Sequence, residues 1–150
     1  MSHSTTLEAN QTVTSLNLLL ADFQLYYQNL RYAHWNVKGP QFLTLHTKFE
    51  QLYTDAALTI DSLAERILAL GSKPLSFFTD YLGEGSIKEA KGAVTAQEMV
   101  KTVVENLRVL AGRLRDLMSH PIDPATDSLI SDLLVQLEKE TWMLTAYLGE

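Results

Sequence analysis

Residues 44–70 read TLHTKFEQLYTDAALTIDSLAERILAL, and this stretch decides the fold of the chain. Apolar residues recur through it at steps of three and four, which is the spacing of one face of an amphipathic helix. The apolar positions, counted from just before the stretch, are Phe42, Leu45, Phe49, Leu52, Ala56, Ile60, Leu63, Ile67 and Leu70. Gly71 and Pro74 follow as stop signals. The pattern therefore predicts a helix from about Thr44 to Leu70.

A long helix is also predicted before this stretch. It should end by Gly39-Pro40, because proline disfavours helical geometry in the residue before it. Its apolar stripe consists of Leu16, Leu20, Phe23, Tyr27, Leu30 and His34. After the stretch the pattern is weaker, and one short helix is predicted there. The residues that predict it are Leu75, Phe78 and Leu82, before Gly83 and Gly85.

Two further long helices follow. Thr95 and Glu98 have the spacing of a capping box, in which each side chain accepts a hydrogen bond from a free backbone N–H of the first turn. The helix that begins there should end at His120-Pro121, and its apolar residues are Val100, Val103, Val104, Leu107, Leu110, Ala111, Leu114 and Leu117. The last helix should begin near Asp123-Pro124. Its apolar residues are Leu129, Leu133, Leu137, Leu144 and Leu148.

Four helices of about 24 to 30 residues predict an all-α four-helix bundle. A length of 150 residues suits one domain over residues 1–150. The connection after residue 70 is long enough to cross the bundle and carries the short helix. We therefore expect the ferritin-like arrangement with one crossover, and a simple up-down-up-down bundle is the alternative.

Composition excludes several classes of function. The chain has no cysteine, so thiolate nucleophiles, iron–sulfur clusters and thiolate zinc sites are excluded, and any metal site must use His and carboxylates. No apolar run approaches a membrane span, and the first residues do not resemble a secretory signal, so we expect a cytoplasmic protein. The net charge of −6 is opposite in sign to that of a dedicated nucleic-acid binder.

Four polar residues share one face of the helix predicted over residues 44–70. His46 and Glu50 are one turn apart, Asp61 and Glu65 are one turn apart, and about 22 Å separates the two pairs. A solvated acidic face is the common explanation for such residues. One metal ion cannot bridge that distance within one chain. If two copies packed antiparallel about a two-fold axis, each first pair would meet the second pair of the other copy.

His34 would complete a mixed set of imidazoles and carboxylates, although a lone histidine on an apolar stripe is more often a core residue. Such a set suits Fe(II), Mn(II) or Zn(II) and leaves a coordination position open for peroxide or oxygen. Glu-x-x-His does not occur in the chain, which excludes the usual di-iron centre inside one bundle. A site between subunits remains.

Several segments together resemble the Dps or mini-ferritin family, the DNA-binding proteins from starved cells. They are His34-Trp35-Asn36-Val37-Lys38-Gly39, Leu45-His46, Phe49, Tyr53, Asp61-Ser62-Leu63-Ala64-Glu65-Arg66, Leu70-Gly71 and Trp142-Met143. The resemblance implies a hollow homododecamer that oxidises Fe(II), preferably with hydrogen peroxide, and stores the ferric mineral. Zinc or manganese could substitute for iron.

The resemblance also implies site residues. The ferroxidase ligands fall on His34 and His46 of one subunit and on Asp61 and Glu65 of its two-fold partner. The remaining ligand falls on Glu50, where aspartate is the usual residue of the family. Trp35 matches a tryptophan thought to intercept oxidising equivalents, and an interface aromatic is the alternative. The acids that could line an iron-entry pore are Asp123, Asp127 and Asp132, and helix capping is the alternative for the first two.

DNA binding in this family often depends on a basic terminal tail. Here no Lys or Arg precedes Arg31 or follows Lys139, so weak or absent DNA binding is expected. Two alternatives to the ferroxidase remain open at this point: a nucleoid-associated protein for which iron is secondary, and an inert helical bundle with an acidic surface.

Overall fold

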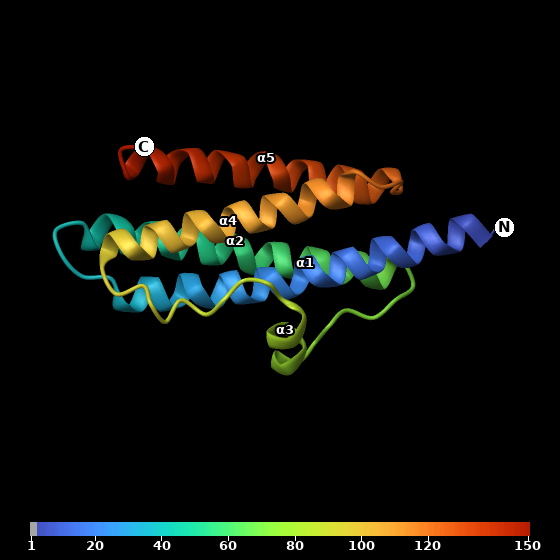
Figure 1. The fold of residues 1–150 in the computed structure, drawn as a ribbon, viewed down its shortest axis with the longest axis horizontal. Helices are drawn as coiled ribbons and strands as arrows, with labels where there is room; N and C mark the ends of the chain where they lie inside the picture. The colour runs from blue at the N-terminus through green and yellow to red at the C-terminus, as the bar shows by residue number, and fades with distance from the viewer. Residues whose placement is uncertain (1–2) are drawn as a thin grey trace.

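The structure is a computed structural model that describes residues 3–150, and it contains the four long helices and the short one that the sequence predicts (Figure 1). The helices are α1 (His3–Asn36), α2 (Phe42–Ala69), α3 (Phe78–Glu84), α4 (Ala96–Met118) and α5 (Pro124–Tyr147). The predicted all-α fold class is therefore confirmed.

Three helices have a boundary that differs from the prediction, and one of them is α4, which ends at Met118, two residues before His120. Helix α2 begins at Phe42, two residues early, and α3 contains Gly83 instead of ending before it. A single glycine costs about 1 kcal/mol relative to alanine inside a helix, which packing can outweigh. Burial of Tyr81 supplies that packing, and the N–H of Gly85 closes α3 by donating to the carbonyl of Tyr81 at 2.9 Å. Leu75, predicted as part of this helix, lies before it.

Helices α1 and α2 form an antiparallel hairpin. The rings of Tyr27 and Tyr53 lie 6.1 Å apart between centroids, and those of His34 and His46 lie 3.7 Å apart. As the residue number rises on α1, it falls on α2 by about the same amount. The residues of the two helices that face each other are thus known along most of the hairpin.

Helices α1 and α4 are antiparallel as well. Asp22 pairs with Arg113, and the side-chain amide of Asn29 donates to that of Asn106 at 2.9 Å. Because α2 and α4 both run opposite to α1, they run parallel to each other. Figure 1 shows the same: the connection after α2 returns along the bundle past α3 before α4 begins. The crossover arrangement is therefore present, and the up-down-up-down alternative is excluded.

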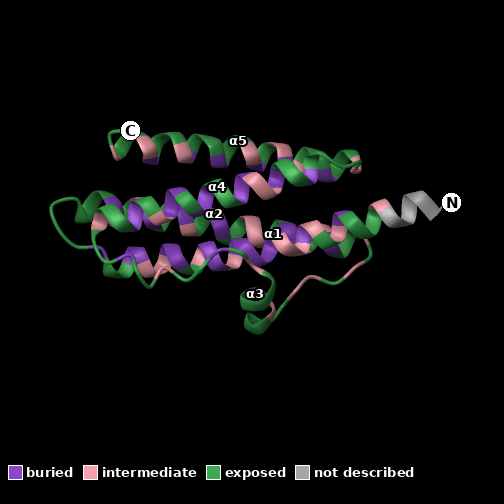
Figure 2. Ribbon diagram, in the orientation of Figure 1, coloured by how far each residue is buried: buried purple, intermediate pink, exposed green. Residues whose placement is uncertain are grey.

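The core lies between the helices, and most buried positions follow the predicted stripes (Figure 2), whereas Phe42, predicted as part of the α2 stripe, is exposed. All eight apolar residues predicted for α4 are buried. On α5 the structure also buries Thr126, Ile130 and Glu140, which the apolar pattern did not predict. Among the described residues, no helix combines the length and apolar character needed to cross a membrane.

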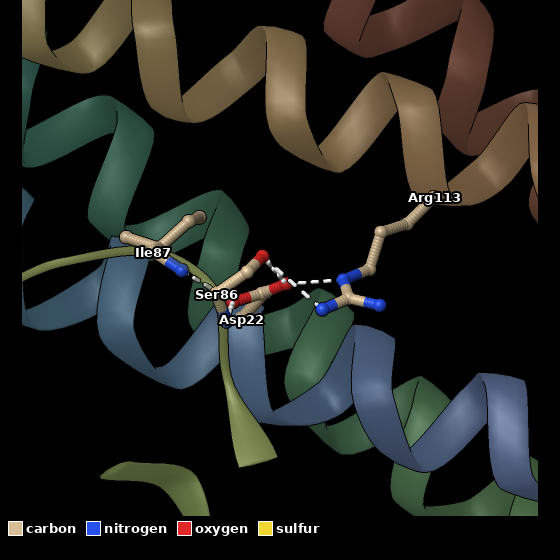
Figure 3. A network of polar contacts seen from close by, with 4 residues as sticks. All are labelled: Asp22, Ser86, Ile87 and Arg113. Carbon is tan, nitrogen blue, oxygen red and sulfur yellow. Dashed lines mark hydrogen bonds and ion pairs between the residues drawn. The ribbon is translucent and has the colours of Figure 1, made fainter. Parts of the chain in front are cut away.

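Buried polar side chains of α1 hold the crossing segment in place. The carboxylate of Asp22 accepts hydrogen bonds from the backbone N–H groups of Ser86 and Ile87 at 2.7 and 2.9 Å, and from the Ser86 hydroxyl at 2.9 Å. The guanidinium of Arg113 on α4 also donates to Asp22 (Figure 3). One side chain with no exposed surface thus joins α1, the connection and α4.

Asn29, two turns later on α1, repeats this arrangement. Its amide nitrogen donates to the carbonyl of Lys88 at 2.9 Å, and its carbonyl oxygen accepts from the N–H of Ala90 at 2.9 Å. Gly85 makes the close approach possible, because a Cβ there would collide with Leu25. The segment therefore crosses the bundle in one defined position.

Candidate metal centre

His34 and His46 meet at one end of the bundle, at the last turn of α1 and the first turns of α2. Their rings are stacked, with centroids 3.7 Å apart and planes 14° from parallel. Nδ1 of His34 lies 2.7 Å from the carbonyl oxygen of His46, and Nδ1 of His46 lies 2.8 Å from the carbonyl oxygen of His34. The antiparallel hairpin and the short connection at residues 37–41 make this reciprocal contact possible.

These two hydrogen bonds determine which nitrogen of each ring can bind a metal ion. A carbonyl oxygen only accepts, so both Nδ1 atoms carry hydrogen. In the neutral ring the lone pair then lies on Nε2. Neither Nε2 has a hydrogen-bond partner among the residues that the structure describes. Metal-binding histidines usually donate the N–H of the other ring nitrogen to a carbonyl or carboxylate oxygen, and both imidazoles have this arrangement.

Two aromatic rings contact the histidine pair. Tyr53 presents its ring to His34 in an edge-to-face contact with centroids 5.2 Å apart, and Phe42 stacks on His46 at 4.9 Å. Sequence reasoning assigned no role to either ring. The available signal was the interval of seven residues between His46 and Tyr53, which places the two on the same helix face. The aromatic contacts limit the rotation of both imidazoles.

Trp35, predicted as the aromatic residue near the site, lies on the outside of α1. Its side chain is 58% exposed, and the guanidinium of Arg31 lies 4.7 Å from its ring centroid. The same guanidinium lies 5.4 Å from the ring of Tyr27. Arg31, which sequence reasoning missed, therefore places a positive charge against two of the aromatic rings near the histidine pair.

Glu50 is exposed on α2, one turn after His46 and one turn before Tyr53. Partial burial of the phenol, together with the negative charge of Glu50, raises the pKa of Tyr53 above its ordinary value. The carboxylate of Glu50 therefore acts on Tyr53 electrostatically as well as lying near the histidine pair.

Asp61 and Glu65 are exposed on α2, and no ion pair to either occurs among the described residues. The helical rise places Asp61 about 22 Å from His46. Within residues 3–150 no group of three or more His, Asp or Glu side chains is placed to hold a metal ion. One chain therefore brings together the two histidines, and it leaves the Asp61 and Glu65 pair separate from them.

The predicted pore acids differ in their surroundings. Asp123 caps α5 by accepting from the N–H of Thr126 at 3.0 Å, and it pairs with Arg66 of α2 at 2.7 Å. Partial burial would raise its pKa, but these hydrogen bonds and Arg66 outweigh burial and lower it. Asp127 and Asp132 are exposed on α5. The capping role anticipated for Asp123 is therefore present.

Comparisons with known proteins agree with this architecture. The family model described as a ferritin-like domain matches residues 13–150. The solved Dps protein of Bacillus brevis is 42% identical, with a TM-score of 0.90 and 99% of each chain covered. That of Vibrio cholerae O1 is 39% identical, with a TM-score of 0.91 and 95% and 92% covered.

A curated relative gives the same result. The "DNA protection during starvation protein 2" of Bacillus anthracis is 40% identical over 143 residues, which are 93% of this chain and 98% of the relative. Sequence similarity and structural similarity thus both extend over nearly the whole length. The chain belongs to the Dps family of the ferritin-like superfamily.

Proposed function

We propose that this protein oxidises Fe(II) to Fe(III) at sites shared between two copies of the chain, and that it stores the ferric mineral inside a hollow homododecamer. His34, His46 and Glu50 of one copy would bind the iron together with Asp61 and Glu65 of the other. Hydrogen peroxide is the preferred oxidant. This activity takes place in the cytoplasm.

One observation carries the proposal: the reciprocal hydrogen bonds leave Nε2 of His34 and of His46 available as ligands, while within residues 3–150 of one chain no group of three or more His, Asp or Glu side chains is placed to hold a metal ion. Exposed Asp61 and Glu65, at the other end of the same helix, have the chemistry to complete it. Imidazoles bind Fe(II), and carboxylates also tolerate Fe(III), so one mixed set serves both oxidation states. Zinc or manganese suits the same donors.

The proposed reaction transfers two electrons to each peroxide molecule and releases no radical. Two Fe(II) ions each give one electron to a peroxide molecule, whose O–O bond breaks to yield two hydroxide ions. The histidines would bind and orient the metal, and the rings of Tyr53 and Phe42 would hold the two imidazoles in place. Exposed Asp127 and Asp132, with Asp123 nearby, would attract Fe(II) towards the interior, because a cluster of negative charge raises the local cation concentration.

Light scattering and iron oxidation on one sample test the proposal. We expect a particle of about twelve chains that forms ferric iron promptly when substoichiometric peroxide is added to Fe(II) under argon. Ferric absorbance should rise by two Fe(III) for each peroxide. A monomer, or an oxidation rate equal to that of buffer, would contradict the proposal.

A nucleoid-binding role is the second candidate, because the similar Bacillus anthracis protein is named for DNA protection. The formal charge of −6 per chain, repeated over an oligomer, opposes binding to phosphate. We therefore expect no retardation of plasmid DNA at pH 7 and about 50 mM salt, where electrostatic binding is strong. Retardation that disappears at high salt would favour the second candidate.

A further inference from the structure

The aromatic residues around the histidine pair differ in their contacts and in their charged neighbours. Tyr53 lies on the inner side, between α1 and α2, with its ring against His34. Trp35 lies on the outer side with Arg31 against its ring. These differences decide which of the residues can more readily give an electron to peroxide at the histidine pair.

Contact favours Tyr53. Its ring centroid lies 5.2 Å from that of His34, in an edge-to-face arrangement that excludes water between the rings. Tyr27 is the next aromatic residue along the interface of α1 and α2, with its ring centroid 6.1 Å from that of Tyr53. Trp35 follows His34 directly in sequence, but successive residues of a helix point in different directions. No ring contact between these two side chains exists in the described part of the chain.

Charge favours Tyr53 as well. Loss of an electron leaves positive charge on a ring or releases a proton from it, so a nearby anion assists it and a nearby cation opposes it. Glu50 supplies an anion beside Tyr53, and its effect there is larger than the opposing effect of the Arg31 guanidinium. The guanidinium of Arg31 lies 4.7 Å from the Trp35 ring and 5.4 Å from the Tyr27 ring, and it opposes oxidation of both.

We propose that Tyr53 donates the second electron when peroxide reaches a site that holds only one Fe(II). This inference rests on the proposed function. The O–O bond breaks, Fe(II) gives one electron and becomes Fe(III), and the Tyr53 phenol gives the other electron and its proton. The products are a neutral tyrosyl radical, one water and one hydroxide ion. Without that second electron, the same encounter would release a hydroxyl radical.

Freeze-quench electron paramagnetic resonance tests this step. The whole assembly is loaded with less than one Fe(II) per site without oxygen and mixed with peroxide, and the radical signal is divided by the ferric iron formed in the same sample. We expect a radical whose spectrum narrows when the protein is made with ring-deuterated tyrosine but not with deuterated tryptophan. In Tyr53→Phe that signal should be lost, and a spin trap should capture more hydroxyl radical.

Two variants serve as comparisons. Tyr32→Phe removes the hydroxyl of a tyrosine on α1, one that donates to the carbonyl of Ala93 at 2.7 Å, and the signal should persist. Trp35→Phe should also retain it. The inference is overturned if Tyr53→Phe keeps the radical, or if Trp35→Phe loses it. Failure of the wild-type protein to form ferric iron above the buffer rate would instead overturn the proposed function, and the inference with it.

Discussion

Mixing two inactive variants is expected to restore iron oxidation. One variant carries His34→Ala with His46→Ala, and the other carries Asp61→Ala with Glu65→Ala. Each alone should lose more than about 100-fold in rate, because loss of an outer-shell partner already costs 10 to 100-fold and here ligands themselves are removed. In a mixed dimer, the intact histidines of one chain meet the intact acids of the other.

The size of the recovery follows from symmetry. After joint unfolding and refolding at equal amounts, about half of the two-fold pairs are mixed and each has one complete site, so about a quarter of the wild-type rate should return. Stopped-flow ferric absorbance measures it. Wild-type chains refolded with a variant that lacks all four residues provide the matched reference, since they also retain about a quarter of the sites.

The recovery separates two arrangements of the site. A site within one chain cannot be repaired by mixing, because each variant lacks ligands of its own. Different mass tags on the two chains verify that the particles contain both variants. If such co-assembled particles remain inactive, a site shared between subunits is refuted. They would leave the fold and the family assignment untouched.

The second large effect is expected for Asp22→Ala. Removal of this carboxylate leaves the guanidinium of Arg113 and the N–H groups of Ser86 and Ile87 without their acceptor. Loss of one partner of a buried ion pair costs about 3–5 kcal/mol of unfolding free energy. We therefore expect the midpoint of urea unfolding, followed by circular dichroism at one protein concentration, to fall markedly.

An exposed ion pair provides the control for Asp22. Glu138 pairs with Arg115 between α5 and α4 at 3.1 Å, and both side chains are more than half exposed. Glu138→Ala should cost about 0–1 kcal/mol, because solvent screens such pairs. Equal shifts of the unfolding midpoint in the two variants would show that the Asp22 network does not hold the crossing segment.

Much of the fold could be predicted from the sequence because its signals are local. The stripe from Leu45 to Ile67, the capping box at Thr95 and Glu98, and Pro124 in the first turn of α5 each specify a helix or its boundary through neighbours on the same helix. Burial of Glu140 could not be predicted this way. Lys48 of α2 pairs with it at 2.6 Å, which allows a charged residue to lie inside the bundle.

The candidate site likewise has one part that the sequence predicts and another part that only tertiary contacts determine. The interval between His46 and Asp61 follows from helical geometry, so the sequence by itself indicated two separate half-sites. The reciprocal bonds between His34 and His46 join residues of different helices, and no periodic pattern specifies them. The same is true of Tyr53 against His34, on which the inferred electron donation rests.

By itself, the sequence determined the four long helices, their buried faces and the residue types available to bind iron, because helix periodicity is set by residues three and four positions apart. Only the tertiary structure decided that α2 and α4 are parallel, through Asp22 and Asn29, and that both imidazoles present Nε2. The physical reason is that these features depend on which atoms of distant segments come into contact. That is decided by the packing of whole helices against one another.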